Sequence, residues 1–593
     1  MAFEGIALLL DLGLILLAAT AFNYIARLLR QPALLAYIAA GIVIGPIGLG
    51  ALGLEFAGVP LGVTTTEEIL ILSELGVAFL LFSIGVESNF SKLAELGKIA
   101  IVGSVCQVTL TALLVFVFNS FLGLLSFEQS LYLGMIVAFS STAIVIKLLS
   151  DSHEINTLHG RLMIGFLLIQ DVLVILALPL LENISNVANV EFIGFLLLKV
   201  IVLLAIAYVL NKYFYPKLFA FATQSEELFF LAAMSSVFIF IFISYLLNFS
   251  IAVGAFVAGV ALSTLTYNLE VAHRIRGVRD FLATIFFVTL GIQITPSFVS
   301  FPLELALVLV GIVFIFKPLI YYLITLFNGY GGRVSLMVAL GLAQVSEFSF
   351  IIANQGKGVL EQTPGLYSFL IVLIALSMAI TPYFMGYTNF FYNLTQRIFG
   401  KLLDPVKQSK RLNKKIDALE SIPDDIEDHI VIFGGGLVGS GIASSLKSEN
   451  KIIVIDNDSE VVWRNIQDKI NSVYGSVDNE EIWRKLRLDK AKVLVIAIPR
   501  SNAAAPLVRY ARKVSPRLAI FGRARYFQDS LVLYKAGADF VIMPHVIGSN
   551  VFVEKVALYL KNKDINEIRN YNHEFMEYLK EKAKKEKPRF VDS

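Results

Sequence analysis

The sequence predicts a polytopic α-helical membrane protein that carries a Rossmann-like α/β domain in its C-terminal part. Of its 593 residues, 56% are hydrophobic and 16% are charged, whereas soluble domains average about 25% charged residues. Long apolar runs continue to about residue 391, after which short β-rich runs alternate with helical periodicity. The predicted parts are a membrane domain (1–391), a polar linker (392–428), an α/β domain (429–560) and a charged helical tail (561–593).

Apolar runs of span length recur through the membrane domain. Since a spanning helix needs about 20 mainly apolar residues, counting these runs predicts about thirteen spans. The second, ninth and tenth are short or rich in glycine, so their ends are the least well defined. The predicted spans are 5–26, 33–50, 68–87, 98–123, 130–150, 160–183, 191–211, 227–248, 250–266, 280–296, 301–327, 334–355 and 365–391.

Basic residues in the loops predict the orientation. They follow odd-numbered spans, with Lys357 as the exception. By the positive-inside rule these loops are cytoplasmic, which places the N-terminus outside and the α/β domain inside a cell membrane (inner or plasma). Basic residues of the linker are expected to meet membrane lipid. The loop residues are Arg27, Arg30, Lys92, Lys98, Lys147, Arg161, Lys212, Lys217, Arg274, Arg276, Arg279 and Arg333.

Two ionisable residues lie in the middle of predicted spans. Asp171 interrupts the otherwise uncharged run 165–181, and Lys317 lies within 301–327. An aspartate at the centre of a span costs about 2.5–3.5 kcal/mol by insertion-based estimates, and such groups usually line ion or proton pathways. A carboxylate that is permanently paired inside a helix bundle is the alternative. Because both charge signs occur near the midplane, we favour a transport site.

A glycine-rich loop marks the start of the α/β domain. The strand 430–433 leads into Gly434-x-Gly436-x-x-Gly439 and a helix, and the next strand, 451–455, ends at Asp456. Glycines allow backbone N–H groups to approach a pyrophosphate at the helix N-terminus, and the acid can bind ribose hydroxyls. Further strands are predicted near 492–498, 517–521 and 539–543. No second soluble domain follows to supply a substrate site, so we interpret the domain as regulatory; a degenerate fold that binds nothing is the alternative.

The order of motifs resembles the monovalent cation:proton antiporter-2 family, specifically Kef-type potassium/proton antiporters with a C-terminal KTN (RCK-like) domain. The membrane motifs that carry the resemblance are QPALLAYIAAGIVIGP, ELGVAFLLFSIGVE, SSTAIVIKLL, LLIQD, AVGAFVAGVALS, FFVTLGIQI and LAQVSEFSF. The motifs of the α/β domain are IVIFGGGLVGSGIA, IVIDND, GRARY and KAGADFVIMP. Together they extend over almost the whole chain.

The resemblance implies an NhaA-like inverted repeat, a homodimer, and two helices that unwind and cross near 140–142 and 344–346. Interrupted helices offer unpaired carbonyls and dipole ends to an ion; for the serines, helix packing is the alternative. The protein would be a transporter and no enzyme, with no bound metal besides the transported cation at Asp171. The implied ion- and proton-binding residues are Asp171, Gln170, Lys317, Ser141, Thr142, Gln344 and Glu347.

The Gln170-Asp171 pair carries the mechanistic prediction. Relatives with two adjacent acids are associated with electrogenic exchange, and here the first acid is an amide. One carboxylate holds either one proton or one cation, which predicts electroneutral exchange of K⁺, or alternatively Na⁺, for H⁺. Lys317 would either take part in this exchange or act as a static counter-ion. Glu347 is a secondary candidate, with a structural role as the alternative.

The nucleotide site that the resemblance implies comprises Gly434, Gly436, Gly439, Asp456, Asp458 and Arg523. The expected regulator is AMP or NAD(H), with ATP as a third candidate. The chain departs from the KTN pattern at Gly475-Ser476, where an acid usually follows the glycine, and the contacts for glutathione gating cannot be matched. An ancillary regulatory subunit is a further partner that the resemblance allows.

Other function classes fit less well. The string Asn328-Gly329-Tyr330-Gly331 is similar to a potassium-channel filter, but it lacks the preceding Thr-Val and falls in a predicted cytoplasmic loop, so we expect a turn. A membrane-anchored redox enzyme is a weaker alternative. The single cysteine, Cys106, excludes an internal disulfide. The net charge of +2 gives no indication of a nucleic-acid partner.

Overall fold

The computed structural model divides into two compact units, 1–415 and 416–593. Most of the predicted linker (392–428) and tail (561–593), as well as Ser476, lie outside the described residues, so the predicted four-part division stays a prediction. The structure describes residues 2–29, 31–53, 55–56, 59–60, 62–63, 67–87, 98–152, 154–155, 157–182, 190–265, 267–297, 301–388, 390–392, 394–395, 426–475, 477, 480–498 and 501–562.

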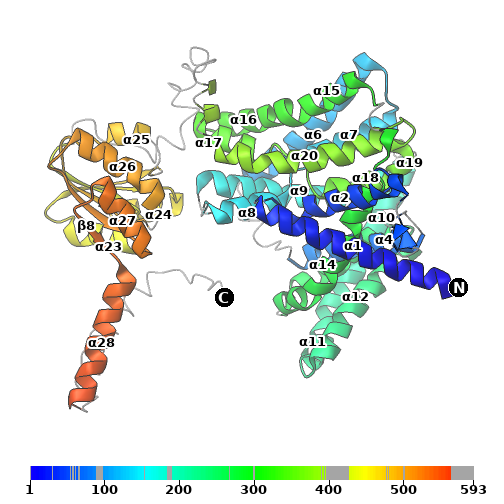
Figure 1. The fold of residues 1–593 in the computed structure, drawn as a ribbon, viewed down its shortest axis with the longest axis horizontal. Coiled ribbons are helices and arrows are strands. Elements are labelled where there is room, and N and C mark those ends of the chain that lie inside the picture. The colour runs from blue at the N-terminus through cyan, green and yellow to red at the C-terminus, as the bar shows by residue number, and fades with distance from the viewer. Residues whose placement is uncertain are drawn as a thin grey trace. The chain divides into compact units, whose positions relative to one another are not determined.

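The first unit is a bundle of crossing helices (Figure 1). Its N-terminal half contains α1 (Ala2–Leu28), α2 (Ala33–Ile44), α3 (Leu49–Leu52), a small antiparallel pair β1 (Glu55–Phe56) and β2 (Val59–Pro60), α4 (Glu67–Glu87), α6 (Lys98–Leu122), α7 (Phe127–Ala138), α8 (Thr142–Asp151) and α9 (Leu158–Glu182). Its C-terminal half contains α10 (Val190–Val209), α11 (Tyr215–Ala222), α12 (Glu226–Leu246), α13 (Ile251–Ser263), α14 (Asn268–Ile292), α15 (Leu303–Gly311), α16 (Lys317–Phe327), α17 (Gly331–Gly341), α18 (Phe348–Gln355), α19 (Lys357–Leu360) and α20 (Leu366–Gly386).

Helix occupies all thirteen of the predicted span ranges, as the ends of these elements show. Within the described residues, ten helical segments are long and apolar enough to cross a membrane, while α13 and α17 are apolar but shorter. The chain is therefore a multi-pass membrane protein, as predicted. Length and composition do not establish the exact count of thirteen.

Two glycine contacts reveal an internal repeat. A Cβ on Gly291 of α14 would lie 2.8 Å from the Cα of Gly41 in α2, and one on Gly259 of α13 would lie 2.8 Å from the Cα of Gly85 in α4. In the predicted order, α2 and α4 are spans two and three, and α13 and α14 are spans nine and ten. Matching spans 1–6 to spans 8–13 exchanges the two contacts. In the predicted numbering of thirteen spans, matched spans are seven apart and run in opposite directions, which agrees with the inverted repeat that the resemblance implies.

Two helices of this unit are interrupted where the sequence predicted. The helix pair α7 and α8 is separated by 139–141, and the pair α17 and α18 by 342–347. The segment 328–331 is a turn between α16 and α17, with positive φ at Gly329 (86°) and Gly331 (69°). The expectation of a turn rather than a filter is thus confirmed.

A π-helical turn precedes Lys317. Pro318 lacks an N–H group and cannot bond to the carbonyl one turn earlier, and the helix adapts through η4 (Ile312–Phe316) between α15 and α16. The same arrangement, η2 (Leu210–Phe214) before Pro216, joins α10 to α11. Single π turns of this kind often occur at functional sites.

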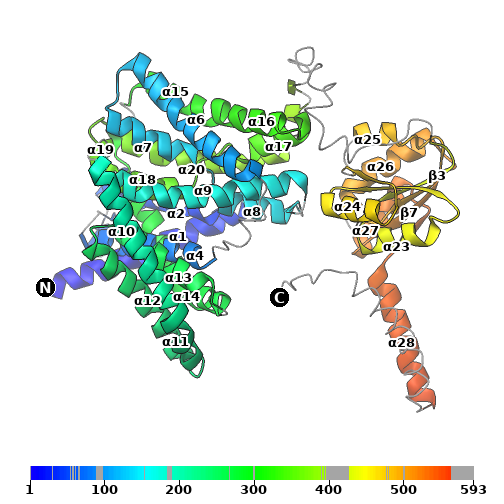
Figure 2. The ribbon, with the colours of Figure 1, turned by 180° about the vertical axis from the view of Figure 1, so that it is seen from behind.

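The second unit is a doubly wound α/β domain (Figure 2). Its strands are β3 (His429–Phe433), β4 (Lys451–Asp456), β5 (Ser472–Tyr474), β6 (Ala491–Ile496), β7 (Ala519–Arg523) and β8 (Phe540–Ile542). Its helices are α23 (Leu437–Leu446), α24 (Ser459–Gln467), α25 (Glu480–Lys485), α26 (Ser501–Val514), α27 (Phe527–Ala536) and α28 (Pro544–Asn562). All strands are parallel in the order β5-β4-β3-β6-β7-β8.

This strand order is the one of dinucleotide-binding Rossmann domains, with the switch point between β3 and β6. Alternate residues of β3 enter two separate apolar clusters: Val431 and Phe433 in one, Ile430 and Ile432 in the other. Both sheet faces are therefore buried, as is typical of a parallel sheet. The prediction of a Rossmann-like domain is confirmed; its sequence ranges omitted the short strand β5.

Candidate ion-binding site and nucleotide-binding loop

Lys317 bonds to the backbone ends of both interrupted helices. Its Nζ donates to Phe139 O at the end of α7 (2.7 Å) and to Gln344 O just beyond α17 (2.7 Å), and the side chain is fully buried. A cation at these C-terminal ends offsets their partial negative charge. Among the described residues, no ion pair joins Lys317 to Asp171. The side chain of Lys317 thus stabilises the crossing by bonding to the backbone carbonyls of Phe139 and Gln344.

Asp171 has a hydroxyl group as its partner. Thr142 Oγ1 lies 3.0 and 3.1 Å from the two carboxylate oxygens of Asp171. Thr142 is the first residue of α8, so the carboxylate lies near the positive end of that half-helix. Asp171 is half-buried rather than sealed. This is a carboxylate in a span, and the hydroxyl group of Thr142, a neutral donor, is its hydrogen-bond partner.

A second carboxylate lies on the other interrupted helix. Glu347 directly precedes α18 and accepts a hydrogen bond from Ser141 Oγ, the N-cap of α8. Glu347 is close enough to Asp171 to interact with it electrostatically. Both acids therefore lie at helix N-termini, while Lys317 bonds to the carbonyls at the C-terminal ends. The charges complement the helix dipoles throughout the crossing.

Gln170 faces the protein and bonds to the backbone of the break. Its Oε1 accepts from Ser140 N (3.0 Å), and its Nε2 donates to Gln107 Oε1 and Tyr321 OH (both 2.5 Å). Gln107 Nε2 in turn donates to Ala138 O (3.0 Å). The sequence analysis missed Gln107 and Tyr321. Their signals were a lone amide in the apolar run of α6 and a tyrosine four residues after Lys317 on one helix face.

Gln344 joins the two interruptions. Its Nε2 lies 3.4 Å from Ser141 O, and its Oε1 accepts from Thr381 Oγ1 of α20 (3.3 Å). All seven predicted residues of the membrane site therefore lie at or beside the crossing. Asp171, Thr142, Ser141 and Glu347 offer side-chain oxygens to an ion, whereas Gln170, Lys317 and Gln344 bond to backbone groups.

A cavity of about 540 Å³ reaches the crossing from one side. Ser141 and Glu347 line it, together with mainly apolar residues and three charged ones of α1 and α8: Arg27, Lys147 and Asp151. These basic residues belong to the loops that the sequence analysis placed in the cytoplasm. The cavity reaches Ser141 and Glu347, while Asp171 and its partner Thr142 are not among the residues that line it.

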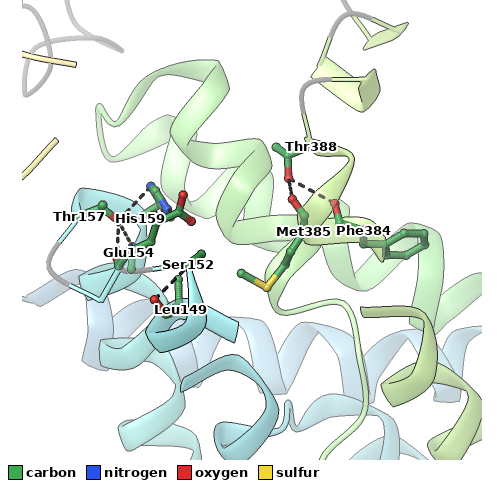
Figure 3. A network of polar contacts seen from close by, with 9 residues as sticks. Leu149, Ser152, Glu154, Thr157, His159, Phe384, Met385 and Thr388 are labelled. Carbon is green, nitrogen blue, oxygen red and sulfur yellow. Dashed lines mark hydrogen bonds and ion pairs between the residues drawn. The ribbon is translucent and has the colours of Figure 1, made fainter. Parts of the chain in front are cut away.

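A polar cluster lies in the loop between α8 and α9, at the start of the helix that carries Asp171 (Figure 3). His159 Nε2 lies 3.3 Å from Glu154 Oε2, and both ring nitrogens lie within 3.2 Å of Thr157 Oγ1. Thr157 Oγ1 also lies 2.7 Å from Glu154 O. His159 is buried, so this polar cluster fixes the start of α9.

The glycine-rich loop of the α/β domain has the geometry that a phosphate requires. Gly434 has φ of 98°, which favours glycine, and Gly436 directly precedes α23. A Cβ on Gly439 would lie 1.7 Å from Gly434 O. Each of the three predicted glycines therefore serves the turn, the helix start or the close packing of the helix on the loop.

Asp456 bonds to this loop. Its Oδ2 accepts from Gly435 N (2.6 Å) and its Oδ1 from Asp458 N (2.7 Å). Burial raises the pKa of Asp456, although these N–H groups oppose the shift. Arg523 ends β7 and donates to Ala497 O beyond β6 (3.4 Å). The predicted residues thus gather at the carboxyl ends of neighbouring strands, where Rossmann domains bind ligands.

An unsatisfied buried group lies beside this loop, on α24. Asn465 Nδ2 has no hydrogen-bond partner among the described residues, and Asn465 is 1% exposed. A Cβ on Gly435 would lie 2.7 Å from this nitrogen. The glycine loop, the helix start and Asp456 together fit a nucleotide, with the loop N–H groups on its phosphates and Asp456 on its ribose.

Comparison with known families decides the identity of the membrane unit. Residues 13–386 match the family described as "Sodium/hydrogen exchanger, transmembrane". The chain belongs to this exchanger family. Residues 430–544 of the exchanger match the TrkA-N domain, and this combination identifies the Kef-type branch of the monovalent cation:proton antiporter-2 family, as the motifs predicted.

Similar proteins carry related names. The exchanger is 28% identical to the putative cation/proton antiporter YbaL of Escherichia coli over 545 residues, or 90% of this chain and 93% of the relative. It is 29% identical to K(+) efflux antiporter 5 of Arabidopsis thaliana over 383 residues, or 63% of this chain and 65% of the relative. The solved sodium proton antiporter MjNhaP1 of Methanocaldococcus jannaschii is 17% identical over 64% of this chain and 98% of its own, with a TM-score of 0.47.

Proposed function

We propose that the protein exchanges K⁺ for H⁺ across a cell membrane, one for one, through Asp171. The observation that carries this proposal is the environment of Asp171, which is half-buried, bonded to Thr142 and without an ion pair to Lys317. Similarity to proteins named K(+) efflux antiporters supports potassium as the cation. Sodium remains the alternative, because both ions bind oxygen ligands.

The chemistry of the exchange needs only one titrating group. Protonated Asp171 is neutral and holds no cation; ionised Asp171 binds one cation, with Thr142 Oγ1 as a neighbouring oxygen ligand. In both transport directions the site is then neutral, because Asp171 carries either a proton or one bound cation. Lys317 stays on the helix ends during the cycle, so that its charge does not enter the stoichiometry.

A specific observation favours Glu347 as a second proton-binding group. Glu347 lines the cavity and lies within electrostatic reach of Asp171. If both acids released a proton for each cation, two protons would move per K⁺ and the exchange would be electrogenic. A Glu347→Gln variant that keeps its stoichiometry would leave Asp171 as the single exchanging group.

The assignment of Asp171 is tested in proteoliposomes that contain purified protein. We expect Asp171→Asn to abolish K⁺-dependent proton movement, because the amide cannot release a proton to a cation. The matched control is Asp151→Asn, an exposed acid near the mouth of the same cavity, which should retain exchange. Exchange by the Asp171→Asn protein at the wild-type rate would refute the assignment.

The α/β domain is proposed to regulate exchange by binding a nucleotide. The glycine loop and Asp456 support AMP or NAD(H) as the ligand. The loop charges support a cytoplasmic position for this domain and an outside N-terminus. A homodimer in the inner or plasma membrane is part of the same proposal, and an ancillary subunit stays a prediction.

A further inference from the structure

The helices of the membrane unit form two groups. A scaffold group comprises α1, α2, α4, α12, α13 and α14, and a crossing group comprises α6, α7, α8, α9, α15, α16, α17, α18 and α20. The scaffold group is joined by contacts such as α4 with α13 and α14, and the crossing group by contacts such as α6 with α7 and α16 with α17. Contacts between the groups include α9 with α13 and α2 with α20. The inverted repeat relates these two contacts to each other, because it matches α9 to α20 and α13 to α2, on opposite faces of the membrane.

The contact between α2 and α20 borders the cavity. Pro32 and Ala33 at the start of α2 and Pro382 in α20 line the space of about 540 Å³ that leads to Glu347. An exposed hydrogen bond from Gln31 Nε2, just before α2, to Tyr383 OH of α20 (3.3 Å) lies there. On the face with the basic loops, the crossing group is therefore open to a cavity.

The contact between α9 and α13 is closed by a carboxylate. Glu182, the last residue of α9, accepts from Ser250 N through Oε2 (3.2 Å) and from Gln355 Nε2 through Oε1. Ser250 is the N-cap of α13, and Gln355 ends α18. One side chain thus joins the helix of Asp171, the half-helix after Glu347 and the scaffold group.

We propose that Glu182 is the closing contact of the outer face, and that outward opening requires its bonds to break. This rests on the proposed exchange function. The carboxylate lies at the N-terminus of α13, where the helix dipole favours a negative charge, and both of its hydrogen bonds are charge-assisted. To open the outer face, α9 and α18 must move away from α13. Glu182 therefore stabilises the state with the cavity on the inner face.

The test measures from which side the cavity can be reached. Ala143 is exposed and lines the cavity, so Ala143→Cys in a Cys106→Ser background places the single thiol there. A membrane-impermeant maleimide is applied to inside-out and right-side-out vesicles without an ion gradient. We expect Glu182→Ala to lower the inside-out labelling rate about threefold or more, because fewer molecules then hold the cavity open to the inner face, and to raise the rate from the other side.

A second variant and a control accompany this measurement. Gln355→Met removes the side-chain donor to Glu182 at similar volume, and it leaves the Ser250 bond in place. Since Gln355 Oε1 has no partner among the described residues, no other bond is lost, and labelling should shift in the same direction by less. Glu361→Gln, an exposed acid paired with Lys357 (3.7 Å), should leave labelling unchanged. If Glu182 had only a structural role, Glu182→Ala would lower the stability of the protein without altering the ratio of the two labelling rates.

Unchanged labelling in both Glu182→Ala and Gln355→Met, or faster labelling from the inner side, would overturn the proposal. Because labelling needs no transport, its result is independent of the exchange assay. If Glu182→Ala causes no labelling shift while Asp171→Asn still abolishes exchange, only the proposal of a closing contact is refuted. If Glu182→Ala shifts labelling while the Asp171→Asn protein retains exchange, only the assignment of the ion site is refuted.

Discussion

The two units satisfy interrupted backbone in opposite ways. In the membrane unit, a cationic side chain, Lys317, occupies carbonyl oxygens at two helix ends. In the α/β unit, an anionic side chain, Asp456, occupies the N–H group of Gly435. Carbonyls are ligands for a cation and loop N–H groups are ligands for a phosphate. In each case a side chain of the protein therefore holds groups of the kind that a ligand would bind.

The difference lies in what can replace each side chain. Lys317 is fully buried at the crossing, and so are Phe139 and Gln344, whose carbonyl groups accept its hydrogen bonds. Asp456 is half-buried at the carboxyl end of β4, where a pyrophosphate can accept the hydrogen bond of the Gly435 N–H group in its place. The comparison indicates a fixed structural contact in one unit and an exchangeable one in the other. Each prediction below changes one side of it.

The largest effect is expected for Lys317→Met. Two buried carbonyls lose their donor, and each unsatisfied group costs about 1–3 kcal/mol. Melting followed by circular dichroism should show the membrane unit strongly destabilised. The two tryptophans, Trp463 and Trp483, lie in 416–593, so the melt of the α/β unit followed by their fluorescence should stay unchanged. Lys212→Met, at an exposed lysine, should alter neither melt. A membrane unit that melts in Lys317→Met as it does in the wild type would contradict a structural role for Lys317.

Gly439→Ala should have the next largest effect. Its new methyl group would lie 1.7 Å from Gly434 O, and overpacking of this kind costs about 1–3 kcal/mol. We expect a lower melting temperature by tryptophan fluorescence and loss of NADH and AMP binding by calorimetry. Gly441→Ala is the matched control: it is on the same helix with no atom within 4 Å of its new Cβ, and it should be neutral or stabilising. Unimpaired nucleotide binding by Gly439→Ala would argue against this loop as the site.

Asp456→Ala separates ribose recognition from phosphate recognition. Loss of the acceptor should weaken NADH and AMP by about tenfold, or 1.4 kcal/mol, whereas pyrophosphate alone should bind no worse because the N–H of Gly435 becomes free. Calorimetry measures all three ligands, with Glu449→Ala, at an exposed acid, as the control. Since burial raises the pKa of Asp456, nucleotide binding should also weaken as pH falls through that raised value. Equal weakening for pyrophosphate would contradict the assigned role.

The smallest effect is expected at His429. Burial lowers the pKa of His429 below 6.5, so the unfolded chain takes up a proton first as pH falls. The stability that this group contributes is complete above about pH 6.5 and is lost below it. His429→Gln keeps a donor for Leu486 O, to which His429 Nε2 bonds (2.9 Å), and should flatten this part of the tryptophan melting profile. Asp539, whose pKa is lowered by the backbone N–H of Ile520, acts only at lower pH. A profile unchanged by His429→Gln would contradict this attribution.

Sequence reasoning succeeded where the signal was local. The two helix breaks were visible as polar clusters inside apolar runs, and the glycine loop with Asp456 was visible as a motif at fixed spacing. The strand β5 was overlooked because three residues carry too little periodicity to be recognised.

The partners of the site residues could not be predicted, because they come from distant backbone. Lys317 bonds to Phe139 O, which is 178 residues away, and no side-chain pattern marks a carbonyl group. An opposite charge near the midplane suggested a partner for Asp171, and the structure instead gives Asp171 the hydroxyl of Thr142. Glu182 lies at the end of its span, where sequence alone does not distinguish a closing contact from a solvated acid.

The central claim is that one proton is exchanged for one cation at Asp171. The most direct test imposes opposing K⁺ and H⁺ gradients on proteoliposomes and finds the ratio at which net flux stops, with the membrane potential clamped at zero and at about 100 mV, which is worth about 2.3 kcal/mol per charge moved. The account predicts that flux stops when the K⁺ ratio equals the H⁺ ratio at both potentials. A balance point that shifts with the potential would contradict it.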